Sequence, residues 1–263
     1  MPLDLPYRTV IAAAHTWFRA MDFRFQVTGQ EHIPRRGGAV LAINHISYVD
    51  FIMAGYGARW SKRMVRFMAK RETFDHPVTG PLMRSFHHIS VDRADGLASY
   101  RTAVEYLRRG EVVGVFPEAT ISRSFEVKEL KTGAVRLAAE AGVPLVPVIL
   151  WGTQRLITKD HPRDFGRGKT ITVTIGEPLH PTAEDAVAET AELRSRMTEM
   201  LDRAIADYPD AEQPPGSWWL PARHGGSAPT PEEAAELDRA ELRERAAKRA
   251  AKRAANGEPG ATA

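Results

Sequence analysis

The sequence contains no cysteine, and this absence removes disulfide bonds, thiolate metal ligands and thiol nucleophiles. It also lacks a run of about twenty apolar residues, the length that a helix needs to cross a bilayer. The apolar run over 9–18 is interrupted by His15, and Asp4 stands where a secretory signal carries positive charge. We therefore expect a cytoplasmic chain that meets lipid only at a membrane surface.

Motifs typical of other enzyme classes are absent as well. The sequence has no G-x-S-x-G, no H-E-x-x-H and no G-x-G-x-x-G. Gly168-Lys169-Thr170 ends like a P-loop, but Arg163 stands where that loop requires its first glycine. These absences argue against a serine elbow, a zinc protease and a P-loop or dinucleotide site.

We expect neither a metal ion nor a nucleic acid as a partner. His87, His88 and Asp92 are close in sequence, but adjacent side chains on a strand point to opposite faces, which does not suit a shared metal. The net charge of +3 is modest, and the cations lack the interleaved aromatic residues of a surface that stacks bases.

The composition, 43% hydrophobic and 26% charged, is that of an ordinary folded protein, and 263 residues suit one domain with an appendage. Near Asp210 a segment rich in Pro, Gly and Ser begins, followed by a stretch rich in Ala, Glu and Arg. We therefore predict an amphipathic helix over 1–22, a globular domain over 23–210, and a Pro/Gly-rich segment with a charged helical tail over 211–263.

Apolar runs and helical patterns alternate through the central part of the chain. Continuous apolar strands separated by helices indicate an α/β domain with a largely parallel or mixed central sheet flanked by helices. Strands are predicted over 23–27, 39–43, 64–69, 112–116, 145–150 and 171–175, with a short one ending at Val91. Helices are predicted over 48–56, 97–107, 134–141 and 187–205, the last with Val187 on its apolar side.

Three segments outside this pattern raise further questions. The amphipathic helix over 7–21 has basic residues on its polar side, so it lies either in a lipid interface or against the body. Trp218 and Trp219 need an apolar environment, and we favour docking on the body over a membrane. The stretch 231–253 is predicted to form a solvated helix with favourable i,i+4 charge pairs.

The segment 44–50, Asn-His-Ile-Ser-Tyr-Val-Asp, has the parts for activating a hydroxyl. It follows an apolar strand, and open α/β sheets place their sites at the carboxyl ends of strands. His45 and Asp50 would lie about 140° apart on an unbroken helix. They meet if His45 is on the entering turn and Asp50 one turn inside the helix. The aspartate would then fix one imidazole nitrogen and leave the other as a base, although a buried or turn histidine gives the same spacing.

Three further blocks follow in order. They are Ile-Ser-Val-Asp-Arg at 89–93, Phe-Pro-Glu-Ala-Thr-Ile-Ser at 116–122, and Val-Pro-Leu-Val-Pro-Val at 143–148. With 44–50, the set resembles the glycerolipid acyltransferase family typified by 1-acylglycerol-3-phosphate acyltransferases. The resemblance covers roughly residues 24 to 180, and four blocks in order are far more specific than one.

The resemblance implies a role for each matching residue. His45 is the general base that takes a proton from the acceptor hydroxyl, and Asp50 orients it. The hydroxyl attacks a thioester directly, in agreement with the missing cysteines and serine elbow, and backbone N–H groups near the helix start would stabilise the oxyanion. The candidate substrate-binding residues are Asn44, Lys70, Arg93, Glu118, Thr120 and Arg123.

Their chemistry differs. Arg93 suits bidentate binding of phosphate, and Lys70 is a second candidate phosphate ligand. Glu118 cannot bind phosphate directly, so we expect it to orient a cation or an acceptor hydroxyl.

The block at 116–122 departs from the family's Phe-Pro-Glu-Gly-Thr-Arg-Ser at two positions. Ala119 replaces the glycine, a change that we do not expect to be tolerated where φ is positive. Ile121 replaces the arginine, so one phosphate contact is missing, and Arg123 is a candidate replacement. These departures leave acyl transfer intact and put the phosphate-bearing acceptor in question.

The reaction implied is transfer of a fatty acyl chain from acyl-CoA or acyl carrier protein to 1-acylglycerol 3-phosphate, giving phosphatidate. It requires a lysophospholipid acceptor, a thioester donor and a peripheral position on the cytoplasmic side of the cell membrane. It implies no metal or redox cofactor, and it leaves the oligomeric state open. Glycerol 3-phosphate, another lysophospholipid or a glycolipid are alternative acceptors. A non-catalytic lipid-binding protein is an alternative of another class, against which the intact His45 and Asp50 argue.

Overall fold

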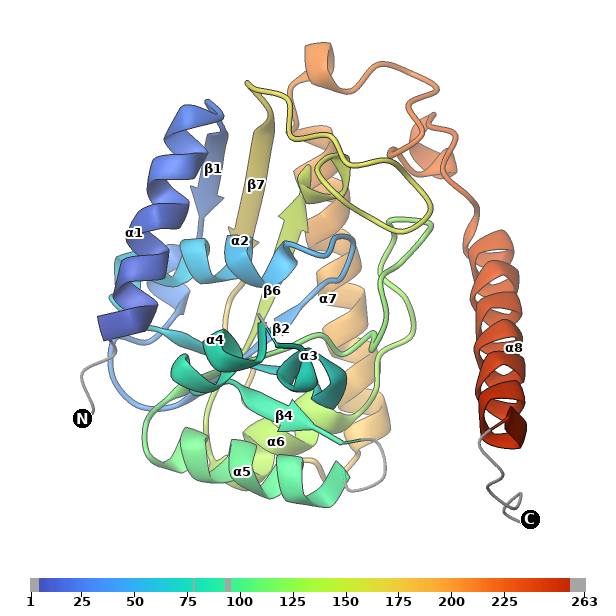
Figure 1. Ribbon diagram of the computed structural model, residues 1–263. Helices are drawn as coiled ribbons and strands as arrows, with labels where there is room; N and C mark the ends of the chain where they lie inside the picture. Colours follow the sequence, from blue (N-terminus) through green and yellow to red (C-terminus); the bar gives the residue numbers. More distant parts are fainter. Residues whose placement is uncertain (1–4, 78, 93–95, 256–263) are drawn as a thin grey trace.

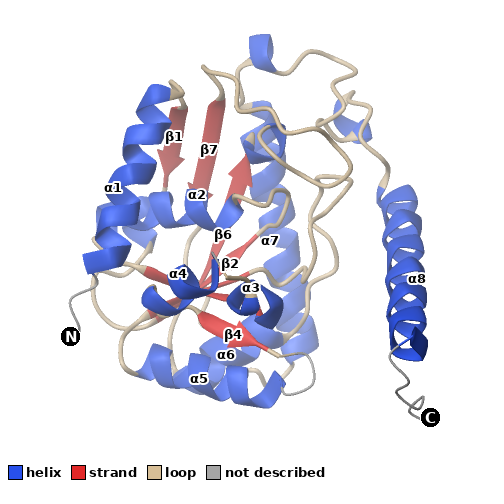
Figure 2. Cartoon of the chain, in the orientation of Figure 1, coloured by secondary structure: helices blue, strands red, loops and turns tan. Residues whose placement is uncertain are grey.

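The computed structural model describes residues 5–77, 79–92 and 96–255, which form a seven-stranded sheet with helices on both faces (Figure 1 and Figure 2). The strands are β1 (Arg24–Thr28), β2 (Ala39–Ile43), β3 (Val65–Lys70), β4 (Ile89–Val91), β5 (Val112–Val115), β6 (Leu145–Trp151) and β7 (Thr170–Ile175). The helices are α1 (Leu5–Ala20), α2 (Asp50–Gly57), α3 (Arg71–Asp75), α4 (Thr79–Ser85), α5 (Gly96–Arg108), α6 (Gly133–Ala141), α7 (Ala186–Ala206) and α8 (Pro231–Ala255).

The sheet is mixed, with strand order β1-β7-β6-β2-β5-β3-β4. The strands from β6 to β4 in this order run parallel to one another, and β1 is parallel to β7. The β6–β7 pair is antiparallel. The mixed α/β fold confirms the prediction from sequence. Because the central strands point the same way, their carboxyl ends meet at one edge of the sheet.

Two apolar clusters hold the layers together. Helices α5, α6 and α7 pack on one face, where Leu193 and Met197 of α7 are fully buried. Helices α1 and α2 cover the other face through residues such as Phe18 and Met53. Strands β2 and β6, with both faces covered, are buried at every position, which explains their continuous apolar runs.

The structure differs from the predictions in three places. The short helices α3 and α4 were not predicted from the sequence, because five to seven residues are too few for a clear helical period. Val187 at the start of α7 is 71% exposed and does not join the buried face of that helix. Helix α8 is not wholly solvated, since Ala234 is 5% exposed and Asp238 forms ion pairs with the body.

Both the N-terminal helix and the tryptophan pair pack on the body of the protein. Helix α1 packs on the sheet, and its Tyr7 hydroxyl donates a hydrogen bond to the Val65 carbonyl at 3.0 Å. Trp219 is buried, and the Trp218 ring stacks on His161 with ring centres 3.8 Å apart. No helix in the described ranges combines the length and the hydropathy that spanning a membrane requires.

Packing of α1 predicts a stability effect that depends on the side of the helix. Phe18 is 4% exposed and lies among Phe23, Phe25 and Tyr56. We expect Phe18→Ala to lower the free energy of unfolding by about 3–5 kcal/mol in urea denaturation, because it leaves a cavity. Val10→Ala, on the exposed side, should change it by less than about 0.5 kcal/mol. Equal effects of the two substitutions would contradict this packing.

Candidate active site

The loop that follows β2 is anchored by Asn44. Its side-chain Nδ2 donates to the Leu150 carbonyl at 3.0 Å, and its Oδ1 accepts the Leu150 N–H at 2.7 Å. The side chain is buried, so both ends of the amide are used to join the loop to the neighbouring strand β6. These bonds give Asn44 a structural role, and its contact with a substrate stays a prediction.

His45 and Asp50 meet as the sequence predicts, but by a different local geometry. Asp50 is the first residue of α2 and does not lie one turn inside the helix. Its Oδ2 lies 3.0 Å from His45 Nδ1 and also accepts the N–H groups of Ile46 and Ser47 at 2.7 Å. The N–H groups of Ile46 and Ser47 are therefore already bonded to Asp50, and stabilisation of an oxyanion by other amides near the helix start stays a prediction.

Thr153, a residue not identified from the sequence, completes the aspartate's surroundings. Its hydroxyl donates to Asp50 Oδ1 at 2.7 Å, and both side chains are 0% exposed. Gly152 lets the chain turn here, with φ of 88°, and a Cβ on it would lie 2.3 Å from the Thr170 carbonyl oxygen. A polar residue directly after the predicted strand ending near 150 was the available signal.

The contacts of the His45 ring define which nitrogen is free. A carboxylate only accepts hydrogen bonds, so in the neutral ring Nδ1 carries the proton that faces Asp50 and Nε2 keeps its lone pair. The ring stacks on Phe116 with centres 4.3 Å apart, and the side chain is 21% exposed. The arrangement presents an oriented, accessible imidazole base.

Glu118, in the loop after β5, supports the histidine. Its Oε1 accepts the His45 N–H at 2.9 Å, and its Oε2 accepts the Lys128 N–H at 3.3 Å. Burial raises the pKa of Glu118 to about 8, against the lowering effect of these two bonds and of the Lys128 charge. The carboxyl thus holds the backbone of His45 and Lys128 in place, and its orientation of a cation or an acceptor hydroxyl stays a prediction.

The loop after β5 tolerates the two departures from the family pattern. Ala119 adopts φ of 62°, so the expectation that alanine would not be tolerated at positive φ is wrong. A non-glycine residue in this region carries a strain of about 1–2 kcal/mol. Ile121 is buried, and the N–H of the next residue, Ser122, donates to the His45 carbonyl at 2.7 Å. The loop therefore bonds to both the N–H and the carbonyl of His45, through Glu118 and Ser122.

Thr120 and Arg123 have protein partners in this structure. The Thr120 hydroxyl accepts a bond from Lys128 Nζ at 2.8 Å. Arg123 pairs with Asp160 at 2.6 Å, with Glu241 of α8 at 2.9 Å, and with Asp238 of α8. Phosphate binding by Arg123 stays a prediction, and it would require exchange of these carboxylates.

Lys70 ends strand β3, which pairs with strand β4. Lys70 is the exposed last residue of β3 and pairs in register with Val91 of β4. Its carboxyl-end position therefore lies two strands from β2 in the sheet, on the edge that carries His45. Arg93 lies outside the described residues.

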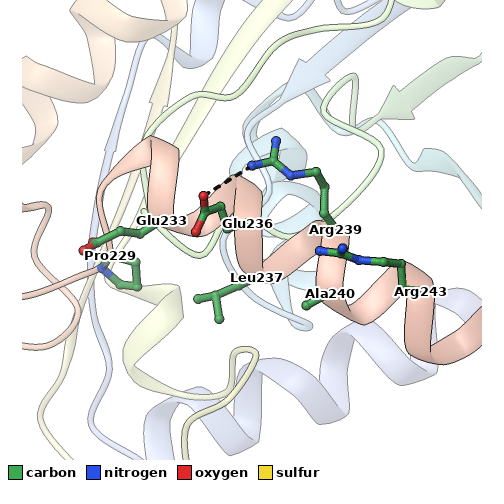
Figure 3. A pocket seen from close by; sticks show the side chains of 7 residues that line it. All are labelled: Pro229, Glu233, Glu236, Leu237, Arg239, Ala240 and Arg243. Carbon is green, nitrogen blue, oxygen red and sulfur yellow. Dashed lines mark ion pairs between the residues drawn. The ribbon is translucent and has the colours of Figure 1, made fainter.

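The described residues contain no cluster of three His, Asp or Glu side chains suited to a metal ion. His88 Nδ1 instead accepts the Phe67 N–H at 3.1 Å, and burial lowers the pKa of His88 to about 4. A pocket on α8, drawn in Figure 3, contains none of the predicted site residues and is therefore separate from the candidate active site. Its lining residues are Pro229, Glu233, Glu236, Leu237, Arg239, Ala240 and Arg243.

Residues 24–151 match the family model described as Acyltransferase. The 1-acyl-sn-glycerol-3-phosphate acyltransferase of Bacillus subtilis (strain 168) is 34% identical over 183 residues, which are 69% of this chain and 86% of that protein. The chloroplastic 1-acyl-sn-glycerol-3-phosphate acyltransferase LPAT1 of Arabidopsis thaliana is 27% identical over 185 residues, 68% of this chain and 50% of that protein. The chain thus spans nearly all of the bacterial relative and about half of the plant one.

A solved structure is similar as well. It is the crystal structure of the 1-acyl-sn-glycerophosphate (LPA) acyltransferase PlsC from Thermotoga maritima, with a TM-score of 0.65 and 25% sequence identity. The similarity covers 77% of this chain and 80% of that one. The part matched by the family model includes His45, Asp50 and Glu118 and ends with β6, two residues before Thr153.

The raised pKa of Glu118 predicts how stability depends on pH. The folded protein holds this proton up to about pH 8, whereas an ordinary glutamate loses it near 4.5. Between these values the folded state binds more protons, so the free energy of unfolding should fall as pH rises, relative to Glu118→Gln. Urea denaturation of both proteins across this interval measures the difference. A difference that does not change with pH would contradict the assignment.

Proposed function

Because this chain belongs to the glycerolipid acyltransferase family, we propose that it acylates the free hydroxyl of 1-acyl-sn-glycerol 3-phosphate to give phosphatidate. The acyl donor in this proposal is a thioester, acyl-CoA or acyl carrier protein. The observation that carries it is the bond from His45 Nδ1 to the Asp50 carboxylate, which leaves Nε2 as an oriented base. The names of the relatives from Bacillus subtilis and Thermotoga maritima support the choice of acceptor.

The reaction needs one proton shuttle. The acceptor hydroxyl loses its proton to His45 Nε2 as its oxygen attacks the thioester carbonyl carbon. The tetrahedral intermediate then collapses, the carbon–sulfur bond breaks, and His45 returns the proton to the leaving thiolate. The ester and the free thiol are the products. Asp50 keeps its charge throughout and stabilises the imidazolium that forms between the two steps.

The proposal places the protein at a lipid surface, peripherally and on the cytoplasmic side. The acceptor is itself a membrane lipid, and the donors are water-soluble thioesters. Tyr48, in the loop between His45 and Asp50, is 52% exposed and presents an aromatic ring close to the site. By family resemblance, the reaction uses no metal or redox cofactor.

Release of thiol from palmitoyl-CoA tests the proposed activity and its base together. Purified protein should release thiol when 1-acylglycerol 3-phosphate is added, and His45→Ala should lower this rate by about 100- to 10,000-fold. His180→Ala, at an exposed position, is the matched control and should keep the full rate. Full activity in folded His45→Ala would contradict the role of His45.

The same assay compares acceptors. Glycerol 3-phosphate, another lysophospholipid and a phosphate-free glycolipid are the competitors to include. Turnover confined to the phosphate-free acceptor would refute the proposed substrate and would connect the buried Ile121 to acceptor choice. Release of thiol with no acceptor at all would indicate a thioesterase.

Thr153 should matter for catalysis through Asp50. Thr153→Val removes the hydroxyl bonded to Asp50 Oδ1, so it should cost about 1–3 kcal/mol of stability and lower kcat by about tenfold, with KM little changed. Thr190→Val removes a buried hydroxyl bonded to Ala186 within α7 and should affect stability alone. Thr153→Ser restores the donor and should restore kcat. Equal kcat values for the two valine variants would show that Thr153 does not position the site.

A further inference from the structure

Helix α8 contacts the body through charge. Asp238 pairs with Lys128 at 2.5 Å, with Lys159 at 3.5 Å and with Arg123. Glu241, one turn on, pairs with Lys159 at 3.0 Å and with Arg123 at 2.9 Å. The two acidic side chains of the helix therefore share one set of three cations, which we call the cation cluster: Arg123, Lys128 and Lys159.

The cation cluster lies between the body and α8. With α8 docked, the side chains of Arg123 and Lys159 are 8% and 12% exposed, so the helix and the body together withdraw these charges from water. Among the described residues of the body, Asp160 is the carboxylate that pairs with a side chain of the cluster. Partly buried cations with too few anions are costly. Three cations beside a single carboxylate among the body's described residues leave an excess of positive charge, and Asp238 and Glu241 of α8 neutralise it.

Apolar contact contributes little to this docking. Ala234 is 5% exposed, but Leu237 and Leu242 are 45% and 59% exposed, and most of the helix beyond Glu241 is exposed. In Figure 1 the helix lies at the side of the domain, beyond the sheet and its covering layers. A helix held mainly by ion pairs can be displaced by a competing anion.

The cluster leads directly to the candidate active site. Lys128 Nζ bridges Asp238 and the Thr120 hydroxyl, and the Lys128 N–H donates to Glu118, which holds the N–H of His45. Arg123 lies on the same loop as Ser122, whose N–H donates to the His45 carbonyl. An anion bound by the cluster would therefore lie against the loop that positions the base.

We propose that the cation cluster is a binding site for a phosphate monoester, and that Asp238 and Glu241 of α8 occupy it as a displaceable internal anion. Docked α8 lowers the affinity for the phosphate, and a bound phosphate releases α8. The choice of a phosphate monoester rests on the proposed function, whose acceptor carries one. An arginine and two lysines beside a serine- and threonine-bearing loop suit that group.

Ionisation of the internal anion agrees with this competition. Burial alone would raise the pKa of Glu241, but hydrogen bonds from Lys159 and Arg123 lower it to about 2. The carboxylate therefore stays charged at neutral pH. The contribution of Glu241 to docking is therefore complete above about pH 4.5 and is lost as the pH falls towards 2.

Binding of inorganic phosphate and of glycerol 3-phosphate by the full chain, measured by calorimetry, tests the competition. The double variant Asp238→Asn/Glu241→Gln should bind with a Kd about tenfold lower, the factor expected if α8 is docked about nine-tenths of the time. Glu236→Gln/Glu244→Gln removes the same charge from exposed positions of α8, which contact Arg239 and Lys248 within the helix, and should leave Kd unchanged. Adding Lys159→Gln to the first variant should abolish the gain.

Hydrogen–deuterium exchange of the unaltered chain gives a second readout that does not depend on any variant folding. Phosphate should speed amide exchange over residues 231–245, while chloride at the same ionic strength should not. Phosphatidylcholine vesicles with and without phosphatidate distinguish a lipid headgroup from a soluble compound as the source of the phosphate monoester. Release by phosphatidate vesicles alone assigns the site to a lipid headgroup, and release by free phosphate assigns it to a soluble monoester.

Two results would overturn the proposal. One is exchange over 231–245 that neither phosphate nor phosphatidate changes. The other is a folded Asp238→Asn/Glu241→Gln variant whose Kd for phosphate equals that of its control. Neither readout requires turnover, so absence of acyl transfer would refute the proposed function and leave this inference to be decided separately.

Discussion

The Asp50 carboxylate is the group on which the rest of the candidate site depends. It is 0% exposed and receives hydrogen bonds from His45 Nδ1, from the N–H groups of Ile46 and Ser47, and from the Thr153 hydroxyl. A buried carboxylate without such donors would cost several kcal/mol. The energetic need to satisfy this one charge therefore fixes the loop, the ring orientation and the tautomer of the histidine together.

The parallel part of the sheet makes this possible by bringing three loops to one edge. β2 lies between β6 and β5, so the loop with His45 has Thr153 on one side and Glu118 on the other. Asn44 joins the start of the loop to β6, and Ser122 joins its backbone to the segment after β5. The chemistry of the pair thus rests on long-range contacts that a linear motif does not contain.

Much of this was predictable from the sequence, for identifiable reasons. Buried parallel strands are continuous apolar runs, so the strands and the α/β class followed from the order of these runs and the helical patterns between them. His45 and Asp50 were identified because they follow the carboxyl end of such a strand and because the surrounding blocks resemble those of the family. The start of α2 at Asp50 was missed because the aspartate caps the loop by accepting its N–H groups, an arrangement that residue spacing does not reveal.

Other features depend on partners far away in the chain. Thr153 lies 103 residues from Asp50, and Arg123 lies 115 residues from Asp238. A local sequence pattern therefore cannot predict either contact. The positive φ of Ala119 was judged too costly for a side chain, yet the surrounding bonds to the His45 backbone hold the loop in that conformation. The tail helix was predicted from its charge pattern, but its docking through two of those charges was not.

The central claim is that Asp50 sets the tautomer of His45 and leaves Nε2 free to act as a base. Nitrogen-15 NMR of selectively labelled histidine, with His45→Ala to assign the signal, measures this directly. The account predicts a protonated Nδ1 and an unprotonated Nε2 for neutral His45, and loss of this preference in Asp50→Asn. A neutral His45 with its proton on Nε2 in the unaltered protein would contradict the account, because the nitrogen facing the substrate could then accept no proton.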